Sequence, residues 1–202
     1  MRPGHTGSGR EGASMKTKNN RQDDPLTSAS KFLALVLRHK PEEAGIELDG
    51  NGWADVCEML DGMRQAGCRI DRQMLERIVQ EDAKGRYAFN EDHTKIRARQ
   101  GHSIPVDVGL SKSVPPDILW HGTGEKFSGS IDKKGLIPKS RLYVHLSKDR
   151  NTARDVGSRH GKPVLYRVDA AQMHRDGHAF FLSENNVWLV KAVPPEYLSK
   201  EE

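Results

Sequence analysis

The chain has 202 residues, enough for one medium domain or two small lobes that share an interface. Its formal net charge of +4 suits a polyanionic partner and also an ordinary basic protein. No stretch approaches the roughly 18 apolar residues of a membrane span, and the N-terminus has no apolar signal core, so we expect a cytoplasmic protein. Cys57 and Cys68 belong to no CxxC or Cys/His cluster and are expected to be reduced thiols.

The first half of the chain predicts a polar tail followed by a small helical lobe. Residues 1–26 are rich in Gly, Ser, Asn and charged residues, which indicates disorder, and Met15 is an alternative start. After the tail we expect three helices and three short strands: a helix from Thr27 or Ser28 to 38–40, a strand at 46–48, a helix closed by Gly67, a helix capped by Asp71, and strands at 86–89 and 95–98. Three helices followed by a hairpin are typical of a winged helix, a common nucleic-acid-binding unit, which we place at 27–110.

The second half of the chain has a different pattern of apolar residues. Residues 111–116 are polar, contain two prolines and predict a linker. Short apolar runs then predict strands at 118–120, 142–144, 164–168, 179–182 and 187–190, with helical pieces at 126–134 and 152–159. This pattern favours a compact lobe of mostly antiparallel sheet over 111–202, and the whole chain is therefore expected to have an α+β fold.

Four short strings place Arg or His beside Gly, Pro or a chain turn: LRHKP at 37–41, IRARQGHS at 96–103, LWHGT at 119–123 and GSRHG at 157–161. Guanidinium groups match phosphate oxygens bidentately, and imidazole adds a further hydrogen bond. The chain has no P-loop and no cluster of metal-binding carboxylates, and its GxGxxG match at 7–12 lies in the polar tail with no predicted strand before it. These strings therefore predict that phosphate is handled without a nucleoside triphosphate or a metal, with arginines stabilising the charge.

Each string taken alone also has a structural interpretation. Arg38 and His39 could close a helix, where cations suit the helix dipole. Arg97 could be a solvated edge charge, and His121 a buried histidine with its hydrogen bonds satisfied. From the residues alone, the sequence indicates a basic, two-lobed protein that handles phosphate, with RNA as an open alternative.

The order and spacing of several strings resemble the tRNA 2′-phosphotransferase family. They are LRHKP, LDGNGW at 48–53, IRARQGHS, HGT, HLSKDRNTARDVGSRHG at 145–161 and SENNVWLV at 183–190, and the resemblance covers about residues 28–198. It implies a winged-helix lobe that grips RNA and an ADP-ribosyltransferase-like lobe that holds NAD.

The resemblance also implies a reaction. The 2′-phosphate of an internal RNA nucleotide attacks the anomeric carbon of the nicotinamide ribose, and nicotinamide departs. The product of this step is an RNA-2′-phospho-ADP-ribose intermediate. The neighbouring 2″-hydroxyl then attacks phosphorus, giving 2′-OH RNA and ADP-ribose 1″,2″-cyclic phosphate. The expected partners are RNA with an internal 2′-phosphate, such as a tRNA, and NAD as a consumed co-substrate. The expected enzyme is a monomer that uses no metal.

Site residues are implied in the same way, by matching the strings. The catalytic group is Arg38, His39, Arg97 and Arg159; the NAD pocket is His121, Gly122, Thr123, His145 and Ser147; His102 and Ser103 line the cleft. Where ordinary ADP-ribosyltransferases carry a glutamate in their third motif, this chain has Val187, although Glu184 lies close by.

Two alternatives remain open at this point. A mono-ADP-ribosyltransferase acting on protein or on terminal nucleic-acid phosphates would keep the NAD lobe and would not need the four-residue catalytic group. A winged-helix RNA-binding protein without activity would leave the HGT and GSRHG strings unexplained.

Overall fold

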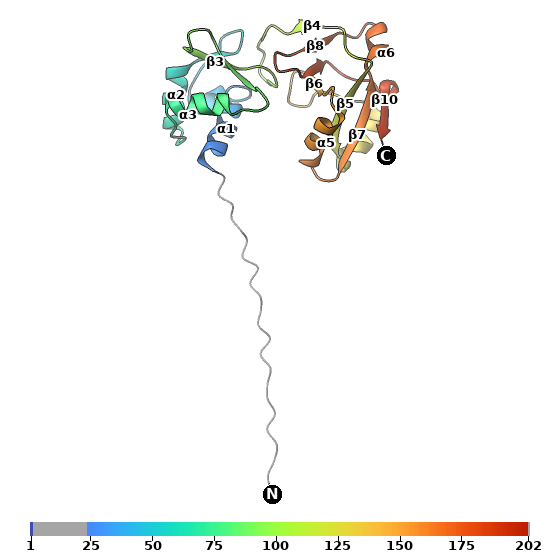
Figure 1. Cartoon of the computed structure of the whole chain (residues 1–202), viewed down its shortest axis with the longest axis horizontal. Coiled ribbons are helices and arrows are strands. Elements are labelled where there is room, and N and C mark those ends of the chain that lie inside the picture. Colours follow the sequence, from blue (N-terminus) through green and yellow to red (C-terminus); the bar gives the residue numbers. More distant parts are fainter. Residues whose placement is uncertain (2–23, 202) are drawn as a thin grey trace.

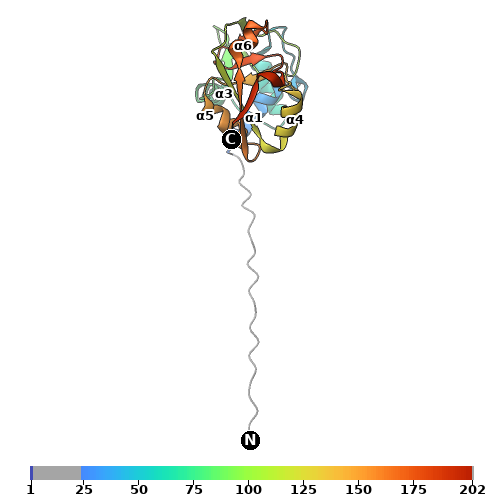
Figure 2. The same cartoon turned by 90° about the vertical axis from the view of Figure 1, so that its right-hand side faces the viewer.

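In the computed structural model, Met1 and residues 24–201 are described. They form two lobes side by side, each with its own apolar core (Figure 1). The core of the first lobe comes from residues between Ala29 and Ala98, and that of the second from residues between Leu119 and Val193. Viewed along the line that joins the lobes, the second lobe covers the first (Figure 2). Helices and antiparallel strands mix in both lobes, as an α+β fold requires, while the boundary placed at residue 110 stays a prediction.

The first lobe contains helices packed against a small antiparallel sheet of order β1-β3-β2. Its elements are α1 Pro25–Val36, the 3-10 turn η1 Pro41–Ala44, β1 Trp53–Asp55, α2 Val56–Gln65, α3 Arg72–Gln80, β2 Tyr87–Phe89 and β3 Lys95–Ala98. The predicted cap of the third helix is confirmed, because the Asp71 side chain accepts a hydrogen bond from the N–H of Met74.

Two predicted boundaries of the first helix are wrong. The helix begins at Pro25, where a proline suits the first helical position because its missing N–H needs no partner there. The predicted tail over 1–26 therefore includes two helical residues, and its residues 2–23, Met15 among them, lie outside the described part of the chain. The helix also ends at Val36, so Arg38 and His39 follow it in a turn.

The strand predicted at 46–48 is also wrong. The N–H of Ile46 is bonded to Pro41 O, which closes the 3-10 turn, and the Ile46 side chain is buried in the core, while Leu48 is partly buried against it. The strand of this region starts seven residues later, at Trp53. There the backbone leaves a turn held by the Asp49 carboxylate and reaches its pairing partner Arg97 in β3.

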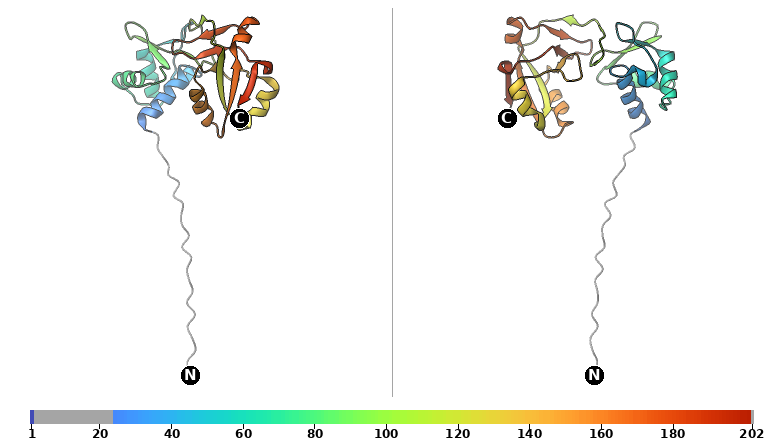
Figure 3. Two further views of the ribbon diagram at one scale, coloured as in Figure 1. Left: turned by 45° about the vertical axis from the view of Figure 1, so that its right-hand side comes forward. Right: turned by 180° about the vertical axis from the view of Figure 1, so that it is seen from behind.

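The second lobe has two antiparallel sheets, of order β10-β7-β5 and β4-β8-β9-β6. Its elements are β4 Ser111–Lys112, β5 Ile118–Gly124, η2 Glu125–Phe127, α4 Ser128–Lys134, β6 Val144–Leu146, α5 Arg150–Ser158, β7 Pro163–Asp169, α6 Ala170–Arg175, β8 Phe180–Leu182, β9 Trp188–Val190, η3 Pro195–Tyr197 and β10 Leu198–Glu201. The expected antiparallel pairing is confirmed. The chain crosses between the lobes along the edge that carries β4, as both views of Figure 3 show.

Differences from the expected second lobe have local causes. The predicted linker contains β4, because Ser111 and Lys112 pair with Leu182 and Phe181 of β8. The strand expected at 142–144 lies at 144–146, since the N–H of Leu142 is bonded to His102 O of the first lobe. Helix α6 and strand β10 were not predicted. None of the helices in the described part of the chain is both long and apolar enough to span a membrane.

Helix α5 lies directly on β5 because glycines face each other there. A Cβ at Gly122 would lie 1.7 Å from the carbonyl oxygen of Ala153, and one at Gly157 would lie 2.9 Å from the backbone nitrogen of Thr123. Real Cβ atoms do not approach a backbone this closely, so these positions need glycine for packing. This contact holds α5 on the side of the second lobe that faces α1 (Figure 1).

Candidate functional site

Arg38 is a buried cation, and no ion pair joins it to a carboxylate among the residues that the structure describes. Its side chain follows α1, is 9% exposed, and lies with Cζ 5.9 Å from the centre of the Tyr87 ring. Its Nε and Nη2 are buried, and neither has a hydrogen-bond partner. Burial lowers the pKa of Arg38 to about 10. A guanidinium in this state retains unused donors for an anion.

Arg97 contributes a second guanidinium from β3. It lies opposite Trp53 in the strand pair, and its Cζ lies 4.5 Å from the centre of the indole ring. Its Nη2 donates to Glu184 of the second lobe at 2.7 Å, while its buried Nε has no partner. The aromatic ring and the carboxylate together fix the plane of this group and leave its buried Nε donor unused.

His102 completes the buried cluster. It is 3% exposed, and its Nε2 has no partner. The pKa of His102 is lowered to about 4, first by burial and then by the charges of Arg38, His39 and Arg97, which must therefore lie near it. Gly101 beside it has a positive φ of 91°, which favours glycine, and a Cβ there would be in ordinary contact with the Arg38 guanidinium at 3.6 Å. Arg38, Arg97 and His102, which we call the buried cluster, hold the only four unpartnered buried side-chain polar atoms among the described residues.

His39 and Ser103 tie the end of α1 to the loop after β3. The His39 Nδ1 lies 3.0 Å from Ser103 Oγ, and the N–H of Ser103 donates to Arg38 O at 2.9 Å. The pKa of His39 is lowered by burial and then by the charges of Arg38 and Arg141. Both predicted residues therefore lie at the buried cluster, as part of the frame that holds Arg38.

The second lobe reaches the same place through His145 and His121. His145 Nε2 lies 2.7 Å from Gln100 Oε1 of the first lobe, and His121 Nδ1 lies 3.1 Å from His145 O. Burial lowers the pKa of His121, and burial with the charges of Arg141 and Arg38 lowers that of His145 to about 3. Both imidazoles are therefore neutral near pH 7.

Arg141 and Gln100 are site residues that the sequence reasoning missed. The charge of Arg141 lowers the pKa of Arg38, His39 and His145, which places this guanidinium near all three. Burial lowers the pKa of Arg141 itself. Gln100 could have been found, since it stands inside the IRARQGHS string next to Gly101. Arg141 gives no such signal, because it precedes β6 in a run of ordinary polar residues.

The residues predicted for an NAD pocket lie on adjoining segments. Trp120 in β5 forms an isolated bridge with Ser147 just after β6, which brings His121 beside His145. Thr123 is buried, and Ser147 Oγ donates to the Asp149 carbonyl at the start of α5. Gly122 lies against α5, where the packing described above requires a glycine. Their roles toward NAD stay predictions.

A cavity of about 240 Å³ adjoins the buried cluster. The first lobe and the segment after it contribute Gln100, Gly101, His102, Val106, Asp107, Val108 and Leu110, and the second lobe contributes Leu142, Tyr143, His145, Phe181 and Leu189. The Tyr143 and Phe181 rings meet edge to face with their centroids 5.5 Å apart. The cavity thus joins an apolar, aromatic wall to the polar groups of Gln100, His102 and His145. None of Gly122, Thr123 and Ser147 lines it.

Arg159 lies apart from the buried cluster. It is exposed and follows the last turn of α5. Its charge lowers the pKa of Lys84, a first-lobe residue, so Arg159 lies near the opposite lobe. The structure therefore brings Arg38, His39 and Arg97 together and leaves Arg159 on the neighbouring surface.

The two residues considered for the third-motif position have different surroundings. The backbone N–H of Val187 donates to Ser183 Oγ, which closes the turn between β8 and β9. The Glu184 carboxylate is engaged by Arg97 and Arg99. Among the described residues, no group of three or more His, Cys, Asp or Glu side chains could hold a metal ion.

Comparisons with known proteins identify similar chains. The sequence profile of "RNA 2′-phosphotransferase, Tpt1 / KptA family" matches residues 24–192. A protein of Flavobacterium johnsoniae named "Probable RNA 2′-phosphotransferase" is 53% identical over 171 residues, which are 85% of this chain and 94% of that protein. Proteins of the same name from Hahella chejuensis and Nostoc punctiforme are 51% and 49% identical, each over 88% of this chain and over 95% and 98% of their own lengths.

Proposed function

The chain belongs to the RNA 2′-phosphotransferase family, and from this premise we propose that it removes an internal RNA 2′-phosphate by transferring it to NAD. The observation that carries the proposal is the buried cluster. Four buried polar atoms on Arg38, Arg97 and His102 have no partner. Leaving such groups unsatisfied costs about 1–3 kcal/mol each, more when the group is charged, so their persistence calls for a ligand.

A phosphate monoester fits this cluster in charge and in the hydrogen-bond donors that the cluster offers. Arg38 and Arg97 offer two guanidinium groups, which bind phosphate oxygens with short, charge-assisted hydrogen bonds. Neutral His102 adds a ring nitrogen without adding charge. We propose that the 2′-phosphate of RNA binds here, with His39 and Ser103 holding Arg38 from behind.

The second-lobe residues are compatible with NAD as the acceptor. When bound, NAD supplies a ribose carbon with a good leaving group, nicotinamide. We propose that the adjoining segments with His121, Thr123, His145 and Ser147 hold it, as in the ADP-ribosyltransferase fold. The cavity of about 240 Å³ beside His102 and His145 has aromatic walls that suit a planar ring. The engagement of Glu184 by two arginines supports this function over protein mono-ADP-ribosylation, for which that carboxylate would need to be free.

The arginines have different tasks in the two proposed steps. In the first step a phosphate that is already negative attacks the ribose carbon, so the protein must chiefly orient it. In the second step phosphorus becomes five-coordinate and negative charge grows on its equatorial oxygens. Preorganised guanidinium donors stabilise that charge. Arg97 serves this second step, and Arg159 joins it if substrate draws the end of α5 toward the cluster.

The first lobe is proposed to be a winged helix that holds the RNA. Its three helices and its sheet of order β1-β3-β2 support this assignment. In this proposal the enzyme works as a monomer, because one chain supplies both sides of the cluster. Its proposed compartment is the cytoplasm.

The test uses a short RNA with one internal 2′-phosphate, incubated with purified protein with and without NAD. We expect 2′-OH RNA, free nicotinamide and ADP-ribose 1″,2″-cyclic phosphate, all only when both substrates are present. Nicotinamide release without the 2′-phosphate would favour a mono-ADP-ribosyltransferase. RNA binding without any nicotinamide release would favour a binding protein. Either result would overturn the proposal.

A further inference from the structure

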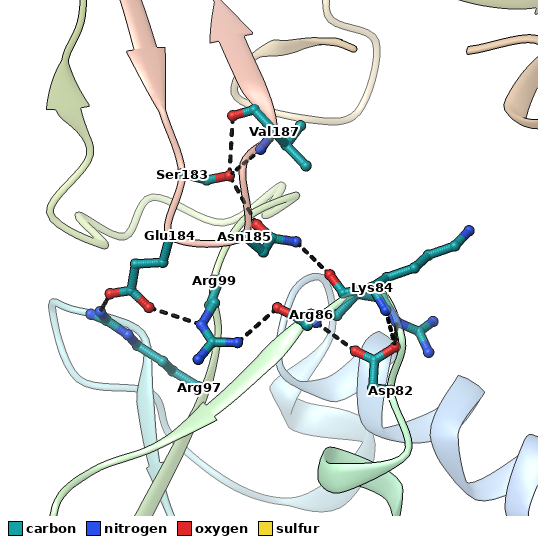
Figure 4. A network of polar contacts seen from close by, with 10 residues as sticks. Asp82, Lys84, Arg86, Arg97, Arg99, Ser183, Glu184, Asn185 and Val187 are labelled. Carbon is teal, nitrogen blue, oxygen red and sulfur yellow. Dashed lines mark hydrogen bonds and ion pairs between the residues drawn. The ribbon is translucent and has the colours of Figure 1, made fainter. Parts of the chain in front are cut away.

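The turn between β8 and β9 is fastened to the first lobe by three polar contacts. Glu184 accepts from Arg97 Nη2 at 2.7 Å and from Arg99 Nε at 2.9 Å, and Asn185 Nδ2 donates to Lys84 O at 2.9 Å. Figure 4 shows the turn reaching from the second lobe to the hairpin that carries Arg97 and Arg99. One short segment of the second lobe thus contacts a residue of the buried cluster directly.

The turn itself is held rigid, so it can fix what it touches. Ser183 Oγ donates to Val187 O and accepts from the N–H of Val187. Asn186 adopts a positive φ of 60°, which an asparagine tolerates and which closes the turn tightly. These contacts fix the backbone on both sides of Glu184, while the two arginines hold its carboxylate.

Arg99 holds Glu184 in place from the other side. Its Nε donates to Glu184 Oε2, and its Nη1 donates to the carbonyl oxygen of Gly85 in the first lobe. The carboxylate is thus shared between an arginine anchored on a backbone carbonyl and the arginine of the buried cluster. This arrangement gives Arg99 a task that does not require it to touch a substrate.

We propose that Glu184 is a positioning residue, which fixes the guanidinium of Arg97 against Trp53 with its Nε buried beside His102. Because Glu184 belongs to the opposite lobe, Arg97 is aligned only while the lobes are docked. The role in turnover rests on the proposed function. The orientation of Arg97 can be measured independently of any reaction.

The kinetic test compares Glu184→Ala and Glu184→Gln with wild type on 2′-phosphorylated RNA and NAD. For Glu184→Ala we expect kcat to fall by about tenfold or more, because a misplaced group loses most of its effect on the transition state. KM for RNA should stay equal or fall, because a negative charge leaves a basic site. Glu184→Gln keeps an acceptor for Arg97, so its kcat should lie between those of Glu184→Ala and wild type.

Two further variants separate positioning from simple lobe docking. Asn185→Ala removes the other contact of the turn, leaves the Arg97–Glu184 pair, and should keep kcat close to wild type. Arg99→Ala should lower kcat, and adding it to Glu184→Ala should cause little further loss, because both act through one carboxylate. An unchanged kcat in Glu184→Ala, or an equal loss in Asn185→Ala, would overturn the proposal.

A spectroscopic measurement decides the case even if wild type proves inactive. In protein with ¹⁵N-labelled arginine, the Nε–H signal of Arg97 is identified by its loss in Arg97→Lys. We expect slow exchange with water in wild type and in Asn185→Ala, and faster exchange in Glu184→Ala. An inactive wild type would refute the proposed function, whereas an Arg97 signal unaffected by Glu184→Ala would refute the positioning role.

Discussion

Arginines of the first lobe occur in two contrasting environments. On α2 and α3, Arg64 and Arg77 have side chains 60% and 63% exposed, and each pairs with a carboxylate one helical turn away, Asp61 and Glu81. Arg38, just after α1, is 9% exposed, and its Nε and Nη2 have no partner in the described part of the chain. Exposed pairs of the first kind contribute little to stability, whereas a buried, unpaired cation opposes folding.

The contrast shows where function is to be sought. Net charge counts Arg64 and Arg38 equally, although one has a carboxylate partner in solvent and the other has none in the interior. The second arrangement costs stability, and a ligand that completes it would account for its presence, so unpartnered burial identifies the site more sharply than basic composition does. Four predictions test this difference.

The largest effect is expected at Arg38. Arg38→Met keeps most of the side-chain volume and removes the charge. We expect turnover of 2′-phosphorylated RNA to fall by about 100- to 1000-fold. Stability should stay equal or rise, because the cost of a buried unpaired cation disappears. Steady-state kinetics and thermal unfolding measure the two effects. Arg64→Met is the control and should change neither; a large loss of stability in Arg38→Met would show that the guanidinium serves folding instead.

The second effect sharpens the comparison in the other lobe, where Gly122 was predicted to bind NAD. Gly122→Ala forces a Cβ against the Ala153 carbonyl and should destabilise the protein by about 3 kcal/mol, with or without NAD. Gly129→Ala in α4 is the matched control, since its Cβ would meet nothing within 4 Å, and it should be neutral or slightly stabilising. Urea unfolding measures both. Unchanged stability in Gly122→Ala with weakened NAD binding would restore a direct role in the pocket.

A third effect concerns pH, because the buried histidine of the cluster is neutral. Folding lowers the pKa of His102 from 6.5 to about 4, so between these values the unfolded chain holds a proton that the folded chain lacks. Stability should therefore fall as pH falls through this window, with His102 contributing a loss of about 2 kcal/mol between pH 7 and pH 5. Urea unfolding at both pH values should show a weaker dependence in His102→Gln. An identical dependence in the variant would mean that His102 is not held neutral.

The smallest effect is expected for the exposed ion pair of Arg77 and Glu81. Arg77→Ala breaks the pair with Glu81, and we expect no measurable change in the midpoint of urea unfolding at physiological salt. A clear loss there would mean that surface pairs support this lobe more than their exposure suggests.

The parts of the fold that were predictable from sequence are those set by local chemistry. The Asp71 cap and the hairpin around 90–94 depend on neighbours within a few residues, and both are present. Strand β1 was missed because it depends on pairing with Arg97, more than forty residues away. Pro25 begins α1 earlier than the hydrophobic periodicity indicated, since that periodicity does not register a proline at the first helical position.

The site residues also divide into those that short strings indicated and those that depend on contacts between the lobes. Arg38, His39, Arg97 and His102 stand in short strings whose composition was informative, and the structure brings them together. Arg141 stands in none of these strings, and although Glu184 stands in SENNVWLV, its pairing with Arg97 depends on the approach of the two lobes, which a string does not indicate. Gly122 stands in an informative string, but the packing of α5 on β5 already requires glycine there.

The most direct test of the central claim measures binding, without NAD, of two short RNAs that differ only in one internal 2′-phosphate. Calorimetry should show that wild type binds the phosphorylated RNA at least about tenfold more tightly, since charge-assisted contacts of roughly 1.5 kcal/mol or more depend on that group. Arg38→Met should bind both RNAs alike. Equal affinities in wild type, or a preference that survives in Arg38→Met, would contradict the assignment of the buried cluster to the 2′-phosphate.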